Sequence, residues 1–169
     1  QVTMPPRRGN KVTLGFEFRD IYRQDLRAYD VSPYFEYYDR RKDSSDWGVY
    51  VEDEIAVHKL LTLNLGLRHD SYSTFGGTYN PRLSIVYSPF RKTTLKAFHG
   101  KAFRAPNAYE LYYDPAALGY KPGSGLLPET IEATELVLEQ SLGTNLRLVG
   151  SAFHNSSKDL INLETDPLD

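Results

Sequence analysis

Few residues of this 169-residue sequence have the types and spacing that catalysis or metal binding requires. The sequence has no cysteine, which excludes disulfides, zinc–thiolate sites and thiol chemistry. The histidines are too widely separated to suggest a zinc site, and they are His58, His69, His99 and His154. Residues 43–46 (Asp-Ser-Ser-Asp) lack the glycine and the terminal glutamate of a calcium-binding loop. We therefore expect no enzymatic activity, no metal and no cofactor.

Binding is the chemistry that the composition favours, because tyrosine is unusually frequent: the sequence has 13 Tyr, 8 Phe and one Trp. Most tyrosines lie in three segments that we expect to be long loops: Tyr22, Tyr29, Tyr34, Tyr37, Tyr38, Tyr72, Tyr79, Tyr109, Tyr112, Tyr113 and Tyr120. Two interpretations stay open. The rings contact a planar or catecholate ligand, or they form a belt at a membrane boundary, with Trp47, Tyr72 and Tyr87 as candidates. A net charge of −2 without a basic run argues against nucleic acid.

The elements that position these residues are predicted from alternation, which is most regular in residues 61–70. Leucine occupies positions 61, 63, 65 and 67, and polar residues or glycine fill the positions between them. Successive side chains of a strand point to opposite faces, so this segment has one aliphatic and one polar face. Similar alternation predicts seven strands, at 11–19, 46–57, 60–70, 81–88, 93–101, 130–140 and 145–155.

The connections between these strands alternate strictly in length. Short ones are expected near 58–60, 89–92 and 141–144, and long ones near 20–45, 71–80 and 102–129. This order predicts an all-β, antiparallel, up-and-down meander with tight turns at one end and long loops at the other. Asp53 interrupts an apolar face, which suggests a bulge or an interfacial position. Phe98 and Phe153 fall on the polar side.

The two faces carry different residues, and the periodicity is compatible with two kinds of protein. A soluble sandwich would bury the apolar face, whereas a membrane barrel would turn it to lipid and enclose the polar face in a lumen. The lipid-facing candidates are Val12, Leu14, Phe16, Phe18, Val49, Val51, Leu63, Leu65, Leu67, Leu83, Ile85, Leu136 and Leu138. The lumen-facing candidates are Glu52, Glu54, Arg68, Arg82, Glu135 and Glu139. No apolar run approaches the roughly 20 residues that a membrane helix needs.

A series of motifs favours the membrane setting. Residues 100–113 contain Phe103-Arg104-Ala105-Pro106, followed by Glu110-Leu111. This segment resembles the Phe-Arg-x-Pro-x-x-x-Glu-Leu signature of TonB-dependent outer-membrane receptors. Further segments match that family in the expected order: 50–54, 63–70, Asn80-Pro81-Arg82-Leu83, Leu127-Pro128-Glu129-Thr130, 134–136, 153–155 and 158–161. The resemblance spans roughly residues 46–161.

The resemblance implies structural roles for the motif residues. Residues 106–113 are expected to form a short helix with Pro106 in its first turn. We expect Arg104 and Glu110 to anchor the base of the loop by charge-assisted hydrogen bonds, in preference to contacting a ligand directly. Pro81 is expected at the first position of a strand, which tolerates proline. Arg68 and Arg82 are expected to be wall residues balanced by Glu52 and Glu54.

The family fold is a plugged barrel of about 22 strands. We therefore expect residues 1–169 to be an interior part of such a barrel domain, without the plug, and an open sheet when taken alone. The resemblance implies a multi-pass protein of the bacterial outer membrane that imports a ferric siderophore or a cobalamin-like chelate. Its expected partners are membrane lipid, its own plug and, through the plug, TonB. The alternatives are a soluble secreted β-sandwich that binds carbohydrate and a self-contained barrel of about eight strands. The sequence does not identify the imported substrate.

Overall fold

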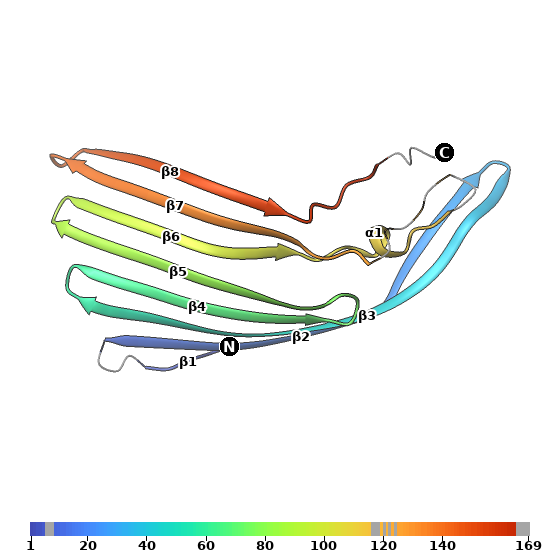
Figure 1. Ribbon diagram of the computed structural model, residues 1–169, viewed down its shortest axis with the longest axis horizontal. Coiled ribbons are helices and arrows are strands. Elements are labelled where there is room, and N and C mark those ends of the chain that lie inside the picture. The colour runs from blue at the N-terminus through green and yellow to red at the C-terminus, as the bar shows by residue number, and fades with distance from the viewer. Residues whose placement is uncertain (6–8, 116–118, 120, 122, 124, 165–169) are drawn as a thin grey trace.

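The computed structural model describes residues 1–5, 9–115, 119, 121, 123 and 125–164, and these residues form one antiparallel sheet (Figure 1). Each strand is hydrogen-bonded to the next one in the sequence, so the predicted open meander is confirmed. The described part has eight strands where seven were expected, since the two-residue β1 is too short to show alternation. The strands are β1 (Val2–Thr3), β2 (Asn10–Val31), β3 (Tyr34–His58), β4 (Leu61–Tyr72), β5 (Gly76–Phe90), β6 (Thr93–Arg104), β7 (Glu129–Leu142) and β8 (Leu146–Lys158).

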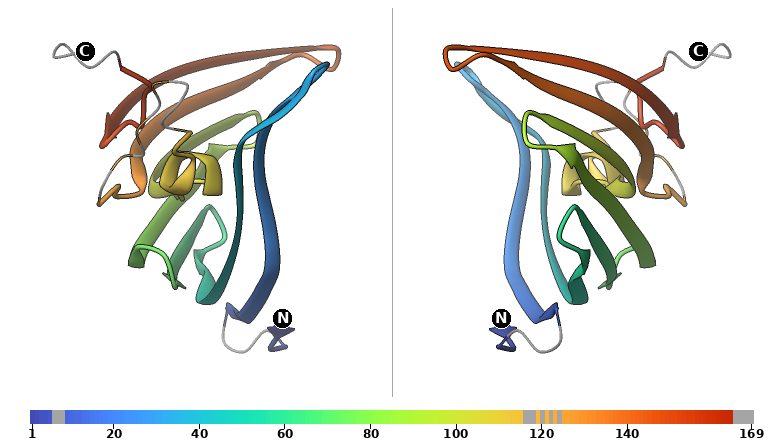
Figure 2. Two further views of the ribbon diagram at one scale, coloured as in Figure 1. Left: turned by 90° about the vertical axis from the view of Figure 1, so that its right-hand side faces the viewer. Right: turned by 90° about the vertical axis from the view of Figure 1, so that its left-hand side faces the viewer.

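The β2–β3 hairpin is the longest feature of the sheet. Its strands have 22 and 25 residues, and it projects past the ends of the other strands and bends over (Figures 1 and 2). The prediction of a long loop over residues 20–45 is therefore wrong. This ribbon has no apolar stripe, and ion pairs join residues that lie opposite each other on its two strands. The pairs are Arg19–Asp46 (3.2 Å), Arg27–Asp39 (3.3 Å) and Arg41–Asp25 (3.3 Å).

The expected loop at 71–80 is also mostly strand. β4 continues to Tyr72 and β5 begins at Gly76, so Pro81 lies inside β5 and not at its start. Pro81 pairs with Leu67 of β4, whereas the ladder between β5 and β6 ends at Arg82–Gly100. Because proline has no N–H to donate, it fits the point where β5 and β6 separate.

The register fixes which side chains share a face. All thirteen lipid-facing candidates lie on one face, here called the leucine face, and all six lumen-facing candidates lie on the opposite face, here called the charged face. Among the described residues no hydrophobic side chain is buried, and Leu65, Phe16 and Leu136 are 44%, 63% and 58% exposed. A sandwich would cover these residues, so the sandwich alternative is wrong for this fold. The separate eight-stranded barrel is also wrong, since the strands follow one another in a linear, open order from β1 to β8.

Two smaller predictions about the faces have different outcomes. Asp53 does not mark a bulge, because the register of β3 against both neighbours is continuous through it. Its carboxylate instead accepts a hydrogen bond from the Asn10 amide (3.1 Å) on the leucine face. Phe98 and Phe153 do lie on the charged face, in register with Ser84 and Glu135.

One short helix, α1 (Ala108–Tyr112), belongs to the connection between β6 and β7. It follows the strand end at Arg104 and contacts β2, which is distant in sequence (Figure 1). The described part of the chain has no helix with the length and apolar character needed to cross a membrane.

Candidate functional site

The helix α1 is fixed to the end of the sheet by one guanidinium group. The Nε and Nη2 atoms of Arg104 donate to the two carboxylate oxygens of Glu129 at 2.6 and 2.8 Å. Its Nη1 and Nη2 atoms donate to both oxygens of Glu110 at 3.0 Å each. The planar guanidinium group can form such paired hydrogen bonds to carboxylates, whereas the ammonium group of lysine cannot. Arg104 therefore joins β6, α1 and the start of β7. We call Arg104, Glu110 and Glu129 the Arg104 clamp.

Both glutamates of the Arg104 clamp also accept backbone hydrogen bonds. Glu110 Oε2 accepts from the N–H of Asn107 (2.8 Å), while the Asn107 side chain accepts from the N–H of Glu110 (2.9 Å). This reciprocal capping box begins the helix at Asn107, so Pro106 precedes the cap and does not lie in the first turn as expected. Glu129 Oε1 accepts from the N–H of Ile161 (2.8 Å), which attaches the segment after β8.

The hydrogen bonds of Arg104 keep these carboxylates ionised. They lower the pKa of Glu110 below its ordinary value and lower that of Glu129 to about 2. Glu110 lies in the helix, and Glu129 lies at the loop end of β7, beyond the apolar positions of that strand. The clamp stays charged at any pH above about 5.

A second set of contacts joins α1 to the β2–β3 hairpin. The Tyr38 hydroxyl donates to the backbone carbonyl of Tyr112, and the Tyr38 ring meets Tyr113 edge-on at 5.4 Å. The Lys42 ammonium lies 4.7 Å from the centre of the Tyr112 ring, and Arg40 lies over Tyr38 at 5.7 Å. We call these five residues the mouth cluster. It places aromatic rings beside two cations at the loop end of the sheet.

A third set of contacts lies on the charged face of β2–β5. Arg68 donates to Asp70 through Nε (2.9 Å) and Nη2 (2.7 Å), and to Glu17 through Nη2 (2.8 Å). Asp70 is 3% exposed, and the amide of Asn80, also 3% exposed, donates to it at 3.4 Å. The expected balance of Arg68 by Glu52 and Glu54 is therefore wrong: its partners are Glu17 and Asp70.

Two glycines make room for this network. A Cβ atom on Gly48 would lie 2.6 Å from an Asp70 oxygen and 2.8 Å from Arg68 Nη2. A Cβ atom on Gly15 would lie 2.1 Å from the ring of Tyr50, over which Arg68 is placed at 5.8 Å. Glycine inside a strand often marks such a close approach, and this signal was available in the sequence.

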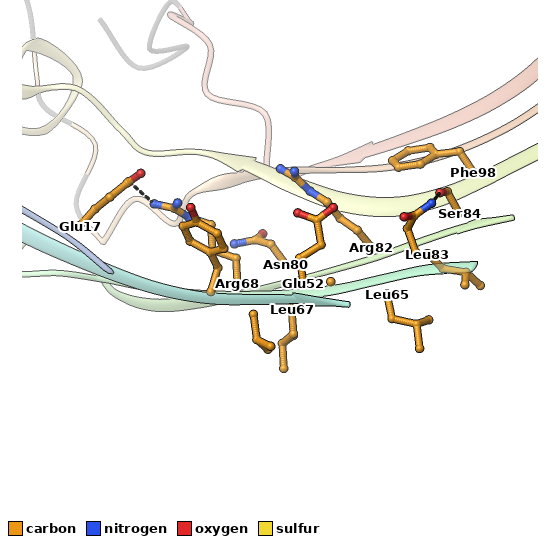
Figure 3. A pocket seen from close by; sticks show the side chains of 14 residues that line it. Glu17, Glu52, Leu65, Leu67, Arg68, Asn80, Arg82, Leu83, Ser84 and Phe98 are labelled. Atoms are coloured by element: carbon orange, nitrogen blue, oxygen red, sulfur yellow. Dashed lines mark hydrogen bonds and ion pairs between the residues drawn. The ribbon is translucent and has the colours of Figure 1, made fainter. Parts of the chain in front are cut away.

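A hollow of about 410 Å³ opens beside the Arg68 network (Figure 3). Gly66 is part of its lining, together with Glu52, Arg82 and Phe98. Figure 3 shows Arg68, Asn80, Arg82 and Glu52 on one side of the strands, and Leu65 and Leu67 on the other. Within the described residues no ion pair is formed by Arg82, Glu52, Glu54 or Glu135, whereas Glu139 pairs with Lys96 (2.6 Å) and with Arg147.

The remaining motif residues surround the same end of the sheet. The Phe103 ring meets Tyr72 edge-on at 5.8 Å, Leu111 is half-buried in α1, and Pro128 directly precedes β7. Tyr72 lies on the charged face in register with Asp46, so it is not part of a belt on the leucine face, whereas Trp47 and Tyr87 are on that face. Tyr120 lies outside the described residues. The described residues contain no group of three His, Cys, Asp or Glu arranged to hold a metal ion.

Comparison with known proteins assigns the class. The family model described as TonB-dependent receptor-like β-barrel matches residues 4–169, so the chain belongs to this family. Its relatives include proteins named as an outer membrane virulence protein and as a probable TonB-dependent siderophore receptor, and the chain is part of an outer-membrane β-barrel.

Individual relatives are longer than this chain. The iron-regulated outer membrane virulence protein of Vibrio cholerae is 33% identical over 125 residues, which are 70% of this chain and 19% of the relative. The ferric enterobactin receptor PirA of Pseudomonas aeruginosa is 38% identical over 77 residues, 46% of this chain and 10% of that protein. A crystal structure of the ferric enterobactin receptor of P. aeruginosa with enterobactin superposes with a TM-score of 0.76 at 24% identity, covering 93% of this chain and 26% of that one. The chain thus spans about a fifth of the Vibrio relative.

Replacing Gly48 by valine in the intact receptor should displace the Arg68–Asp70 pair and destabilise the fold by about 1–3 kcal/mol, the usual cost of overpacking. Urea unfolding in lipid vesicles measures this change. Gly150→Val is the matched control, because nothing lies within 4 Å of a Cβ atom at that strand position. Equal stability of the two variants would contradict the close packing at Gly48.

Replacing Arg104 by lysine should release α1 while leaving the sheet folded, because one ammonium cannot form four hydrogen bonds to two carboxylates. Limited proteolysis between residues 105 and 128 should become severalfold faster, with unchanged cleavage elsewhere. Arg23→Lys, on the hairpin, is the control. Unchanged proteolysis of Arg104→Lys would show that the clamp does not order the loop.

The clamp should also respond to acid in a defined direction. Its two carboxylates have lowered pKa values in the folded state, so their stabilisation is complete above about pH 5 and decreases as the pH falls toward 2. Hydrogen exchange of the α1 amides should be constant from pH 5 to 7, after correction for intrinsic rates, and gain speed below about pH 4. The variant Glu129→Gln should lose protection already at pH 7.

Proposed function

We propose that this chain forms part of the wall and mouth of an outer-membrane receptor that imports a ferric siderophore with energy supplied through TonB. The observation that carries the proposal is the division of one sheet into a bare leucine face and a charged face. The leucine face is suited to contact the hydrocarbon of a membrane, and the charged face is suited to an enclosed, hydrated interior. The lipid-facing and lumen-facing assignments of these residues are part of the proposal.

The mouth cluster supports an anionic, aromatic cargo. Lys42 and Arg40 offer positive charge, while Tyr38, Tyr112 and Tyr113 offer flat rings, which together suit a ferric catecholate. The relatives named as ferric enterobactin receptors support the same class. A cobalamin-like cargo has no specific support among these contacts. The receptor is proposed to act as a transporter and not as an enzyme.

The interior of the barrel is proposed to hold a plug that TonB rearranges. The charged residues that form no ion pair within the described part, Arg82 and Glu52 at the hollow, are suited to contact such a domain. The hollow lies on the charged face beside the Arg68 network, in which Arg68 is already paired with Asp70 and Glu17. This difference supports a structural role for Arg68 in the barrel wall and a contact between Arg82 and the plug that can form and break.

Leu65→Arg tests the orientation of the sheet. In the intact receptor in lipid vesicles, this change should cost about 2–4 kcal/mol of unfolding free energy, as for arginine near a bilayer midplane. Thr62→Arg, three positions away on the charged face, should cost much less because its side chain remains hydrated. A near-neutral Leu65→Arg would show that this residue does not face hydrocarbon.

Growth on single iron sources tests the cargo. A deletion of the full gene in the source bacterium should abolish growth on one ferric catecholate, and growth on haem should persist. Complementation with Lys42→Gln should raise the chelate concentration for half-maximal uptake about tenfold, as expected for one charged contact. Lys11→Gln, on the charged face far from the mouth, should restore normal uptake. Unimpaired growth of the deletion strain on every ferric siderophore would contradict the proposal.

A further inference from the structure

Residues that are register partners on successive strands form a row across the sheet. The apolar segment of the leucine face does not follow one such row, because its position along the strand shifts steadily from β2 to β8. On β2 they are residues 12–18, and on β8 the apolar and small residues are 146–152. One continuous row joins Val12, Asp53, Leu65, Leu83, His99, Thr134 and His154. This row begins among apolar residues and ends among polar ones.

The displacement gives the tilt of the strands in the bilayer. On β2 the centre of the apolar segment lies about three residues from the row toward the loops, and on β8 it lies about five residues from the row toward the turns. The shift is therefore about eight residues over six inter-strand spacings, which is about 26 Å along the strands for about 29 Å across them. The corresponding tilt is about 40°, within the range of membrane barrels. The apolar segments therefore form one level band, and the residues just beyond it lie at the height of the lipid headgroups.

The boundary residues at the loop end differ between the two halves of the sheet. On β3–β5 they are aromatic: His69 stacks on Tyr79 at 4.4 Å and meets Trp47 edge-on at 5.4 Å. Aromatic residues at this depth are common in membrane barrels. On β6–β8 the residues just beyond the apolar band are polar apart from Phe103, which shares a register row with Thr130 and Lys158. We call His99, Lys101, Thr134, His154 and Lys158 the basic patch.

The basic patch is a row of hydrogen-bond donors on three adjacent strands. His99 Nδ1 lies 2.9 Å from Thr134 Oγ1, and His154 is the register partner of Thr134 on the next strand. Lys101 lies two residues beyond His99 toward the loops on the same face, and Lys158 lies four residues beyond His154. Glu132 is the register partner of Lys101 on the same face, so the two lysines and this glutamate together carry one net positive charge. No ion pair of Lys101, Lys158 or Glu132 is found within the described part of the chain.

We propose that the basic patch binds the phosphate groups of lipid headgroups in the outer leaflet. The patch is continuous with the leucine face, it lies at the headgroup level set by the tilt, and its charge complements a phosphate. Lys101 supplies the charge nearest to the two imidazoles, whose free ring nitrogens supply hydrogen bonds. The proposal rests on the proposed orientation of the leucine face toward lipid, and it does not depend on which chelate is imported.

Lipid binding to the intact receptor tests this proposal. The probe is lipid A with both phosphates, compared with the same lipid after enzymatic removal of the phosphates, and retained lipid is measured by native mass spectrometry. The wild type should retain the phosphorylated form preferentially. The triple variant His99→Gln, Lys101→Gln, His154→Gln should bind it at least fivefold more weakly. Lys11→Gln, on the opposite face, should bind like the wild type.

Each other outcome overturns the inference. Equal retention of both lipids would mean that only the acyl chains are bound, and wild-type binding by the triple variant would place the phosphate elsewhere. Loss of a receptor dimer in the variant would instead assign the patch to a second copy. If the triple variant fails to fold, Lys101→Gln alone, which should bind at least twofold more weakly, decides the question. Chelate uptake is measured on the wild type and on the same variants. If the wild type imports the chelate but shows no preference for the phosphorylated lipid, only this inference is refuted. If the wild type binds the phosphorylated lipid but imports no chelate, only the proposed import function is refuted.

Discussion

The structure depends on the antiparallel ladder, in which each strand from β2 to β7 is bonded to a neighbour on both sides. Hydrocarbon cannot hydrogen-bond to a peptide group, so a chain that crosses a membrane as strands must pair its backbone in this way. The ladder also forces successive side chains to opposite faces. This explains how a protein of the outer membrane has a mean hydropathy of −0.49, because half of each strand and every connection can be polar.

Part of the charge on the charged face is balanced locally, at the Arg68 network. Arg68 is balanced by Asp70 on its own strand and by Glu17 of β2 across β3, and Gly48 leaves the space between them. This arrangement needs a residue without a side chain on the intervening strand. Close packing on the charged face is therefore local to the Arg68 network, where Asp70 and Asn80 are each 3% exposed.

The sequence predicted the strands whose two faces differ in polarity, and it failed where both faces are polar. The β2–β3 hairpin between residues 20 and 45 has no apolar stripe, so periodicity could not reveal it. Opposite charges at nearly equal distances from the turn at 32–33, Arg27 with Asp39 and Asp25 with Arg41, were the available signal. The role of Arg104 as an anchor with Glu110 followed from the resemblance and agrees with the geometry. Asp70 lies two residues from Arg68 on the same face of the predicted strand, so this partner could have been predicted. The second partner, Glu17, could not, because its position near Arg68 depends on the register of β2, β3 and β4.

The contacts at the loop end couple the hairpin to the wall. The Arg104 clamp fixes α1 to β6 and β7, and Tyr38 and Lys42 fix the hairpin to α1. The hairpin itself has little apolar contact, so its position over the sheet is set by a few polar and aromatic contacts. Three contacts join the hairpin to α1 and its C-terminal end: the Tyr38–Tyr112 hydrogen bond, the Tyr38–Tyr113 ring contact and the Lys42–Tyr112 contact. The helix α1 therefore links the hairpin to the sheet, because the Arg104 clamp holds it on one side and Tyr38 and Lys42 contact it on the other.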